Sequence, residues 1–322
     1  MIVCIPTLSE EKNNLSGKSL FCSRLATCLR ESGVKVIKDL NKKHNISLNL
    51  VFSQKTKFKS AKRVVRLDGI WHNLDQPYKK MNDPISKSIN DCDGVVYQTL
   101  FCKKVSDKYI GKSSAKLEVI YNGADPLFYD NIIPAKRKAK NCFITYARWR
   151  PQKRLRDAIK SFLMADIEDS ILYVAGDISK CGIPKTVLKK YFSKSNIEYL
   201  GHVNQYILAS YLKICKASIH LSWIDWCPNS VVEAICCGIP VITNNVGGTQ
   251  EIVRLSGGIV CDIDAKWDLS PCKLYNPPPV DKRIVADALI KCVKENIKTN
   301  YYHVDIANVA KAYINFFLKV LE

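Results

Sequence analysis

The chain has 322 residues, 47% of them hydrophobic and 25% charged, which is room for two domains and excludes a disordered protein. No apolar run approaches the 18 residues of a membrane span, and the N-terminus lacks a signal-peptide layout, so we expect a cytoplasmic protein. The formal net charge of +19 favours an anionic ligand or surface.

Short apolar runs alternate with amphipathic stretches in the first half of the chain, which indicates an α/β architecture with parallel strands. Strands are predicted at 2–5, 34–37, 48–52, 63–67, 94–97 and 117–120. Helices are predicted at 19–32 and 84–89. The charged segment 134–140 has the composition of a linker, so the first domain is predicted over residues 1–135.

The same rhythm restarts after this linker. A helix is predicted at 155–164, and strands are predicted at 141–146, 170–175, 197–200, 217–221, 240–243 and 258–261. This second domain spans residues 136–304, and a last helix follows at 305–321 within the terminal segment 305–322. Two successive doubly wound units predict a cleft at the carboxyl ends of their strands.

The positive charge is concentrated in the first half. Residues 1–140 hold 26 Lys and Arg against 13 Asp and Glu, a balance of +13. The lysines are scattered, without interleaved aromatic residues or a nucleic-acid-binding motif, so we expect no nucleic acid as a partner. A solvated basic face is the simplest interpretation, and a basic nucleic-acid-binding protein is kept as an alternative function. An anionic membrane surface would suit the charge too, at most through peripheral contact.

The fourteen cysteines contain no C-x-x-C pair, and Cys236 and Cys237 are adjacent, which suits neither a zinc site nor an ordinary disulfide. We expect reduced, mostly buried thiols and no bound metal.

The stretch NNLSGKS, residues 13–19, contains the Gly-Lys-Ser of a P-loop. A P-loop needs another glycine five residues before Gly17, and Lys12 stands there. The stretch is better explained as a glycine-containing loop between a strand and a helix, a place that often faces a phosphate.

The densest signal lies between residues 225 and 251. Pro228 suits a first helical turn, Ser230 and Glu233 have capping-box spacing, and Gly238 suits a helix end. A helix N-terminus placed after a strand presents N–H groups to an anion. Alternatively, Glu233 only caps its own helix.

These residues resemble the family 4 retaining glycosyltransferases, whose pattern is Glu-x7-Glu, then Ala-x3-Gly-x-Pro-Val and a Gly-Gly loop. The chain has Asp225-x7-Glu233, then Ala234, Gly238, Pro240-Val241 and Gly247-Gly248. Asp225 keeps the charge of the family's glutamate on a shorter side chain. Four other stretches fit the family in the right order, namely residues 120–128, 146–155, 173–177 and 199–203.

The resemblance implies the GT-B fold, with two Rossmann-like domains, a cleft between them and a C-terminal helix crossing back onto the first. It implies a metal-independent enzyme without a cofactor that moves a hexose from a UDP- or GDP-sugar with retention of configuration. The acceptor would be a glycan, a lipid-linked molecule or a protein. A catalytically inactive GT-B partner subunit is a further alternative, supported only by Asp225.

The resemblance also assigns roles. Arg148 and Lys153 would stabilise the leaving diphosphate as catalytic residues; alternatively, they are surface cations on a loop. Asp225 would contact the donor sugar, and Glu233 would accept from the ribose hydroxyls. The remaining donor-binding residues would be Gly17, Gly201, His202, Val203, Cys227, Pro228, Asn229 and Ser230.

Asp68 is a departure from the family, because many members have His-Gly where Asp68-Gly69 falls. It is expected to orient the acceptor hydroxyl or the donor sugar, with His72 replacing the family's histidine. Alternatively, Asp68 caps a turn.

Overall fold

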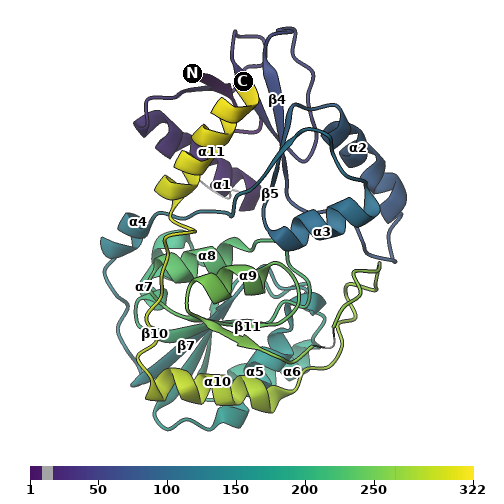
Figure 1. Cartoon of the computed structure of the whole chain (residues 1–322). Coiled ribbons are helices and arrows are strands. Elements are labelled where there is room, and N and C mark those ends of the chain that lie inside the picture. The colour runs from purple at the N-terminus through teal and green to yellow at the C-terminus, as the bar shows by residue number, and fades with distance from the viewer. Residues whose placement is uncertain (9–16, 265) are drawn as a thin grey trace. The chain divides into compact units, whose positions relative to one another are not determined.

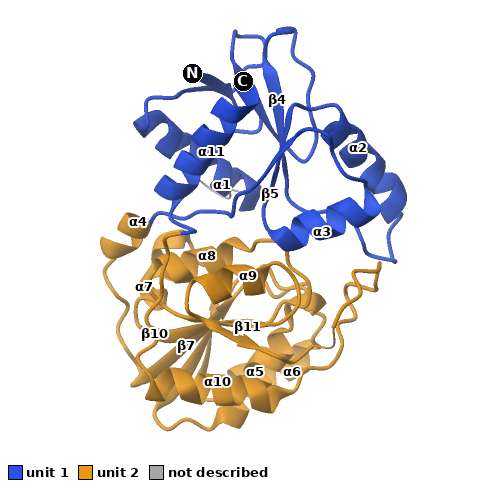
Figure 2. Ribbon diagram, viewed as in Figure 1, with its two compact units in different colours: residues 1–125, 303–322 blue, residues 126–302 orange. Residues whose placement is uncertain are grey.

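The computed structural model describes residues 1–8, 17–264 and 266–322, which divide into two compact units. Unit 1 comprises residues 1–125 and 303–322, and unit 2 comprises residues 126–302 (Figure 2). Each unit contains a six-stranded parallel sheet with helices packed against it (Figure 1). The expected α/β architecture of two doubly wound domains is confirmed.

The sheet of unit 1 has the strand order β2-β1-β3-β4-β5-β6, and every neighbouring pair is parallel. Its strands are β1 (Ile2–Cys4), β2 (Lys35–Ile37), β3 (Ile46–Leu50), β4 (Lys62–Leu67), β5 (Gly94–Tyr97) and β6 (Lys116–Val119). Its helices are α1 (Gly17–Glu31), α2 (Tyr78–Asn90), α3 (Leu100–Tyr109) and α11 (Ile306–Leu321). All six strands were predicted to within two residues at each end.

Helix α2 corrects one expectation. It was predicted to begin at Pro84, but it begins at Tyr78 and contains Pro84 in its interior. The buried residues of α2 are Asn82, Ile85, Ser88 and Ile89, which form one helical face. Burial of this face outweighs the backbone hydrogen bond that proline cannot donate.

Helix α11 belongs to unit 1. Asp305 caps it by accepting a hydrogen bond from the Ala307 N–H at 2.9 Å, and α11 packs against α1. Its buried face consists of Ile306, Val309, Ala310, Tyr313, Phe316, Phe317 and Val320. A Cβ atom at Gly94 would lie 2.9 Å from Val320 Cγ2, so the glycine lets α11 approach β5.

The sheet of unit 2 has the order β12-β11-β10-β7-β8-β9, again parallel throughout. Its strands are β7 (Asn141–Tyr146), β8 (Ser170–Ala175), β9 (Ile197–Gly201), β10 (Cys215–His220), β11 (Val241–Asn244) and β12 (Ile259–Cys261). Its helices are α4 (Pro126–Asp130), η1 (Pro151–Lys153), α5 (Leu155–Ala165), α6 (Lys185–Phe192), α7 (Gln205–Leu212), α8 (Asn229–Cys236), α9 (Thr249–Leu255) and α10 (Lys282–Lys294).

The boundary between the units lies at residue 125, whereas the sequence placed it at 135. Helix α4 causes the difference because it packs into unit 2. The Phe128 ring lies 5.3 Å from the Tyr206 ring, and Lys213 Nζ donates to the Tyr129 carbonyl at 2.9 Å.

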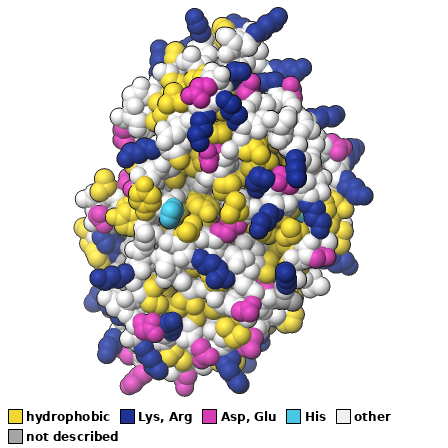
Figure 3. Space-filling model, viewed as in Figure 1, with side chains coloured by type: hydrophobic (Ala, Val, Ile, Leu, Met, Phe, Trp, Pro, Cys, Tyr) yellow, Lys and Arg dark blue, Asp and Glu magenta, His cyan; other side chains and the backbone are white. Residues whose placement is uncertain are grey.

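Two bulk properties follow from what the structure describes. All fourteen cysteines are free, and most are buried. Across residues 1–8, 17–264 and 266–322, no helix has both the length and the apolar character to cross a membrane. On the face drawn in Figure 3, lysine and arginine side chains are spread over both units and interleaved with hydrophobic ones.

Candidate active site

Polar side chains gather at the carboxyl edge of the unit 2 sheet. Strand β7 leads to Arg148 and, through η1, to Lys153. Strand β10 ends at His220. Asp225 lies in the loop that connects β10 to α8. Because the carboxyl ends of parallel strands share one edge, segments that are distant in the sequence meet here.

Lys153, Asp225 and His220 form one cluster. Lys153 Nζ is ion-paired with Asp225 Oδ2, and His220 Nε2 lies 3.3 Å from the same oxygen. The other carboxylate oxygen accepts a hydrogen bond from the Trp226 N–H at 3.1 Å. The structure thus joins two residues that were expected to act separately, and it adds His220, which the sequence analysis missed.

The cluster has a defined charge state. Burial alone would raise the pKa of Asp225, but the Lys153 ammonium and the hydrogen bond to His220 outweigh it and hold that pKa well below its usual range. Burial lowers the pKa of His220. At neutral pH the cluster is therefore a carboxylate beside an ammonium and a neutral imidazole.

The Gly-Gly loop packs closely against the backbone of Asp225, and this close approach requires glycine. Gly247 has φ +89°, and a Cβ atom there would lie 2.8 Å from the Asp225 carbonyl oxygen. The Gly248 N–H donates to that oxygen at 2.8 Å. Two parts of the sequence motif are therefore in direct contact.

Helix α8 starts beside the cluster but without the expected capping box. Its N-cap is Pro228, which makes no side-chain cap, so Ser230 and Glu233 both lie within the helix. The Ser230 hydroxyl lies 3.4 Å from His220 Nδ1, and its carbonyl accepts from the Tyr146 hydroxyl. The capping-box prediction for Ser230 was wrong, because Pro228 takes the N-cap position. The alternative that Glu233 only caps its helix stays a prediction. Glu233 is buried in α8, as is Cys227 just before it, while Asn229 is half-buried.

The residue after Lys153 is anchored by a buried ion pair. Arg154 has φ +55°, and its guanidinium bonds both oxygens of Asp264, at 2.8 and 2.6 Å. Both side chains are fully buried, and Asn244 Nδ2 donates to Asp264 at 2.7 Å. This pair holds the end of η1 and with it the backbone of Lys153.

Within the described residues, Arg148 and His202 form no hydrogen bond or ion pair with the cluster. Both are exposed, and within the described part of the chain Arg148 forms no hydrogen bond or ion pair. Hydrogen bonds from Ser179 lower the pKa of the exposed Asp177, with smaller contributions from the charges of Arg148 and His202. Arg148, Asp177 and His202 come after β7, β8 and β9, and these charge contributions show that they are neighbours. Gly201 ends β9 at φ +72° with open space around it, and Val203 is half-buried.

Unit 1 has its own polar cluster around Asp68, at the carboxyl ends of β4 and β5. Asp68 is ion-paired with Arg66 and accepts from Gln98, and Lys18 Nζ lies 3.6 Å from it. Arg66 also bonds Asn122. Asp68 is thus a charge-paired group rather than a simple turn cap. Gln98 was missed by the sequence analysis, although its position just after a strand was a usable signal.

Other candidates from unit 1 lie as follows. Gly17 is the first residue of α1, one before Lys18, and residues 13–16 of NNLSGKS lie outside the described residues. His72 is buried, and its Nδ1 lies 3.3 Å from the Ile70 carbonyl oxygen; burial lowers its pKa.

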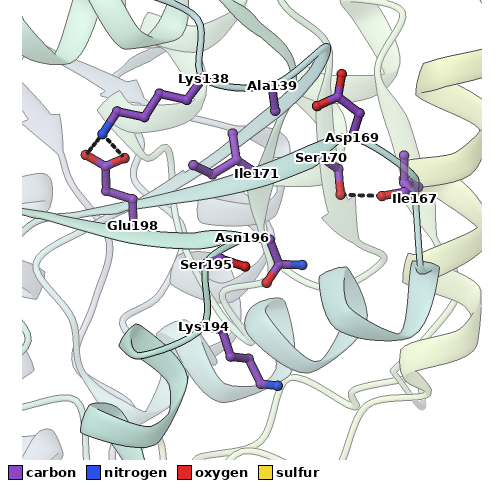
Figure 4. A pocket seen from close by; sticks show the side chains of 10 residues that line it. All are labelled: Lys138, Ala139, Ile167, Asp169, Ser170, Ile171, Lys194, Ser195, Asn196 and Glu198. Atoms are coloured by element: carbon purple, nitrogen blue, oxygen red, sulfur yellow. Dashed lines mark hydrogen bonds and ion pairs between the residues drawn. The ribbon is translucent and has the colours of Figure 1, made fainter.

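A pocket of about 590 Å³ opens at the opposite edge of the unit 2 sheet (Figure 4). Lys138 Nζ bonds both oxygens of Glu198 there, at 2.9 and 2.8 Å, and Lys194 lies across the pocket. It is lined from the amino ends of β8 and β9, so it is separate from the Asp225 cluster.

Across residues 1–8, 17–264 and 266–322, no group of three or more His, Cys, Asp and Glu side chains has the arrangement of a metal site.

Comparisons with known proteins identify the chain's class. Residues 130–269 match the family model described as glycosyl transferases group 1, and they include Lys153, Asp225 and α8. A search of curated proteins finds no match.

Solved structures resemble the whole chain. A sucrose-phosphate synthase from Thermosynechococcus elongatus has a TM-score of 0.65 at 11% identity, covering 99% of this chain and 96% of that one. AviGT4, a glycosyltransferase involved in avilamycin A biosynthesis, gives 0.65 at 13% identity, with 99% and 97% covered. Anabaena Alr3699/HepE gives 0.61 at 15% identity, with 99% and 97% covered. At these identities the likeness shows the fold, which is GT-B. With this fold and the match of residues 130–269 to the group 1 model, the chain is a glycosyltransferase.

Proposed function

We propose that the chain transfers a hexose from a UDP- or GDP-sugar, with retention of configuration and without a metal ion, to a glycan or a lipid-linked acceptor. The observation that carries this proposal is the Lys153–Asp225 ion pair beside the first turn of α8. One solved structure of Anabaena Alr3699/HepE, whose fold matches at a TM-score of 0.56, is a complex with UDP-glucose, which supports a nucleotide-sugar donor.

The reaction needs charge stabilisation more than a nucleophile. The bond from the anomeric carbon to the diphosphate oxygen breaks, and a bond from that carbon to the acceptor oxygen forms on the same face. The acceptor's proton passes to the leaving diphosphate oxygen. Negative charge grows on the diphosphate, and a cation placed there stabilises the transition state more than the ground state. Lys153 and Arg148 supply that charge.

Asp225 and Glu233 contact two other parts of the donor, the sugar and the ribose. Asp225 accepts a hydrogen bond from a sugar hydroxyl, since it stays ionised beside Lys153. Glu233 accepts from the ribose hydroxyls. Backbone atoms of residues 227–230 and 201–203 hold the remaining donor oxygens.

Unit 1 is proposed to recognise the acceptor through Asp68. Arg66 and Lys18 keep charge opposite this carboxylate, which suits it to orient an acceptor hydroxyl. The basic balance of residues 1–140 suits an acceptor that is acidic or held at an anionic membrane surface.

A panel of UDP- and GDP-sugars, assayed with and without EDTA against glycan and lipid-linked acceptors, tests this function. We expect nucleotide release with one donor class, unchanged by EDTA, and an α-linked product from an α-linked donor. No release with any donor would refute the function, and loss of activity in EDTA would refute its metal-free part.

The acceptor is tested by co-sedimentation with liposomes. Binding to vesicles that contain phosphatidylglycerol, but not to phosphatidylcholine vesicles, supports a lipid-linked acceptor. Equal, negligible binding to both favours a soluble glycan or a protein.

A further inference from the structure

His220 is the last residue of β10, and no motif in the sequence assigns it a role. Its side chain is only 5% exposed. It pairs in register with Thr243 of β11, whose hydroxyl donates to the His220 carbonyl at 2.8 Å. The sheet therefore fixes the backbone from which the imidazole projects.

Both ring nitrogens of His220 have polar partners. Nε2 lies 3.3 Å from Asp225 Oδ2, and Nδ1 lies 3.4 Å from Ser230 Oγ. A carboxylate can only accept hydrogen bonds, so a neutral ring places its proton on Nε2. Nδ1 then has a free lone pair and accepts from the Ser230 hydroxyl.

The neutral ring is the form that the surroundings favour. Burial lowers the pKa of His220, and the Lys153 charge acts in the same direction, while Asp225 opposes both. Thr243 of β11 and Ser230 of α8, the other polar partners, do not titrate near neutral pH.

The tautomer decides what Ser230 can do. Its single proton points at Nδ1, so the outer side of its oxygen carries lone pairs only. A hydroxyl held in this way accepts a hydrogen bond from a sugar hydroxyl, whereas a phosphate oxygen, itself an acceptor, finds no donor there. Ser230 has no other side-chain hydrogen bond within the described residues that would compete.

We infer that His220 is a positioning residue that holds Asp225 and Ser230 as one hydrogen-bonded unit, so that both accept from hydroxyl groups of the donor's sugar. This inference rests on the proposed function and deepens it, because it assigns Asp225 and Ser230 to the sugar rather than to the diphosphate. Lys153, at the outer end of the same chain of contacts, is left to face the diphosphate.

The first test needs no ligand. Nitrogen-15 NMR of histidine-labelled protein at pH 7 reports which ring nitrogen carries the proton, and His220→Gln identifies the signal. We expect a neutral ring protonated at Nε2, with an Nδ1 signal that moves in Ser230→Ala. A proton on Nδ1, or a charged ring, overturns the inference whether or not the chain is a sugar transferase.

The second test separates sugar from diphosphate. Calorimetry compares UDP-glucose with UDP, and GDP-mannose with GDP, in wild type, Ser230→Ala, His220→Gln and the double variant. In His220→Gln the amide takes the place of Nε2, so it can still donate to Asp225, but it leaves the place of Nδ1, which Ser230 contacts, without an acceptor.

We expect both single variants to lose roughly fivefold to tenfold in nucleotide-sugar affinity, the loss of one hydrogen bond, while free nucleotide affinity stays within about twofold. The double variant should lose no more affinity than either single variant, because either substitution alone already breaks the hydrogen-bonded unit of Asp225, His220 and Ser230. His220→Asn, whose amide takes the place of Nδ1 and does not reach Asp225, breaks the same unit and should lose as much as the other single variants. Ser193→Ala, at an exposed serine after α6, is the matched control.

Equal losses for the sugar nucleotide and the free nucleotide, or additive losses in the double variant, overturn the inference. If wild type binds none of the four ligands, the proposed function fails, and the NMR result still decides the tautomer. Thermal unfolding of each variant confirms that it is folded.

Discussion

The two units each place an aspartate after a strand and pair it with a cation, but the cations differ. In unit 1, Arg66 is 1% exposed and stacks over the Phe21 ring at 4.1 Å while it bonds Asp68 and Asn122. In unit 2, the Lys153 side chain is 20% exposed and its ammonium bonds Asp225.

The difference gives the two cations different roles: Arg66 fixes Asp68 in place, whereas Lys153 can contact a second anion. A guanidinium clamped by two acceptors and an aromatic face has little freedom left, so Arg66 serves to hold Asp68. An ammonium has three rotatable donors, and at a partly exposed position it can meet a second anion while it stays near Asp225. Unit 1 therefore offers a preset carboxylate, and unit 2 offers a mobile positive charge.

The largest expected effect tests the fixed pair. Arg66→Leu should lower the free energy of unfolding by about 3 kcal/mol, because the partly buried Asp68 loses its main counter-charge. Urea unfolding followed by circular dichroism measures this.

Arg63→Leu is the matched control in the same strand, since its pair with the largely exposed Asp91 is a surface pair. It should cost less than about 1 kcal/mol. Equal losses in the two variants would show that Arg66 is not the clamped group described above.

The proposed role of Lys153 and Arg148 is tested by measuring kcat. Lys153→Ala should lower kcat by roughly 100-fold, because a charge that stabilises the leaving diphosphate is removed, and Arg148→Ala should do the same. Steady-state release of the nucleotide measures both.

Lys160→Ala, at an exposed lysine of α5, is the control and should keep wild-type turnover. If Lys153→Ala and Arg148→Ala both retain kcat, the assignment of this segment to the diphosphate is wrong.

A smaller effect asks which unit binds the nucleotide. Glu233→Gln should weaken UDP or GDP binding roughly tenfold, because the amide accepts less strongly from ribose hydroxyls. Asp68→Asn in unit 1 should leave that affinity within about twofold. Calorimetry of both variants gives the comparison, and similar losses would remove the division of roles between the units.

The smallest expected effect is in pH dependence. The pKa of Asp225 is lowered, so its contribution to stability is complete above its unfolded pKa of about 4 and is lost as the pH falls below that. In Lys153→Ala the effect of burial prevails and raises the pKa of Asp225. The free energy of unfolding of this variant should therefore fall by about 1 kcal/mol relative to wild type as the pH rises from 4 to 6.

Urea unfolding over this range measures the effect. Asp225→Asn should abolish the difference, and the same series in His220→Gln removes any contribution from the imidazole. A difference that is constant with pH would contradict the assigned charge state of Asp225.

The sequence by itself determined the order of the strands, whereas helices such as α3 and α10 were not individually predicted. Twelve short apolar runs predicted the twelve strands of the described residues, because buried parallel strands need continuous apolar side chains whatever their neighbours are. The spacing from Asp225 to Gly248 indicated the donor side of the site, since a loop, a helix start and a glycine turn are set by local backbone preferences.

Tertiary structure decided which of these residues meet. Lys153 and Asp225 are 72 residues apart, and Arg66 and Asn122 are 56 apart, so neither pair has a local signal. Helix α2 continues through Pro84, and α4 joins unit 2, because burial against distant residues outweighs local composition. His220 follows the same rule: a histidine at a strand end acquires its role only when the sheet places it between Asp225 and Ser230.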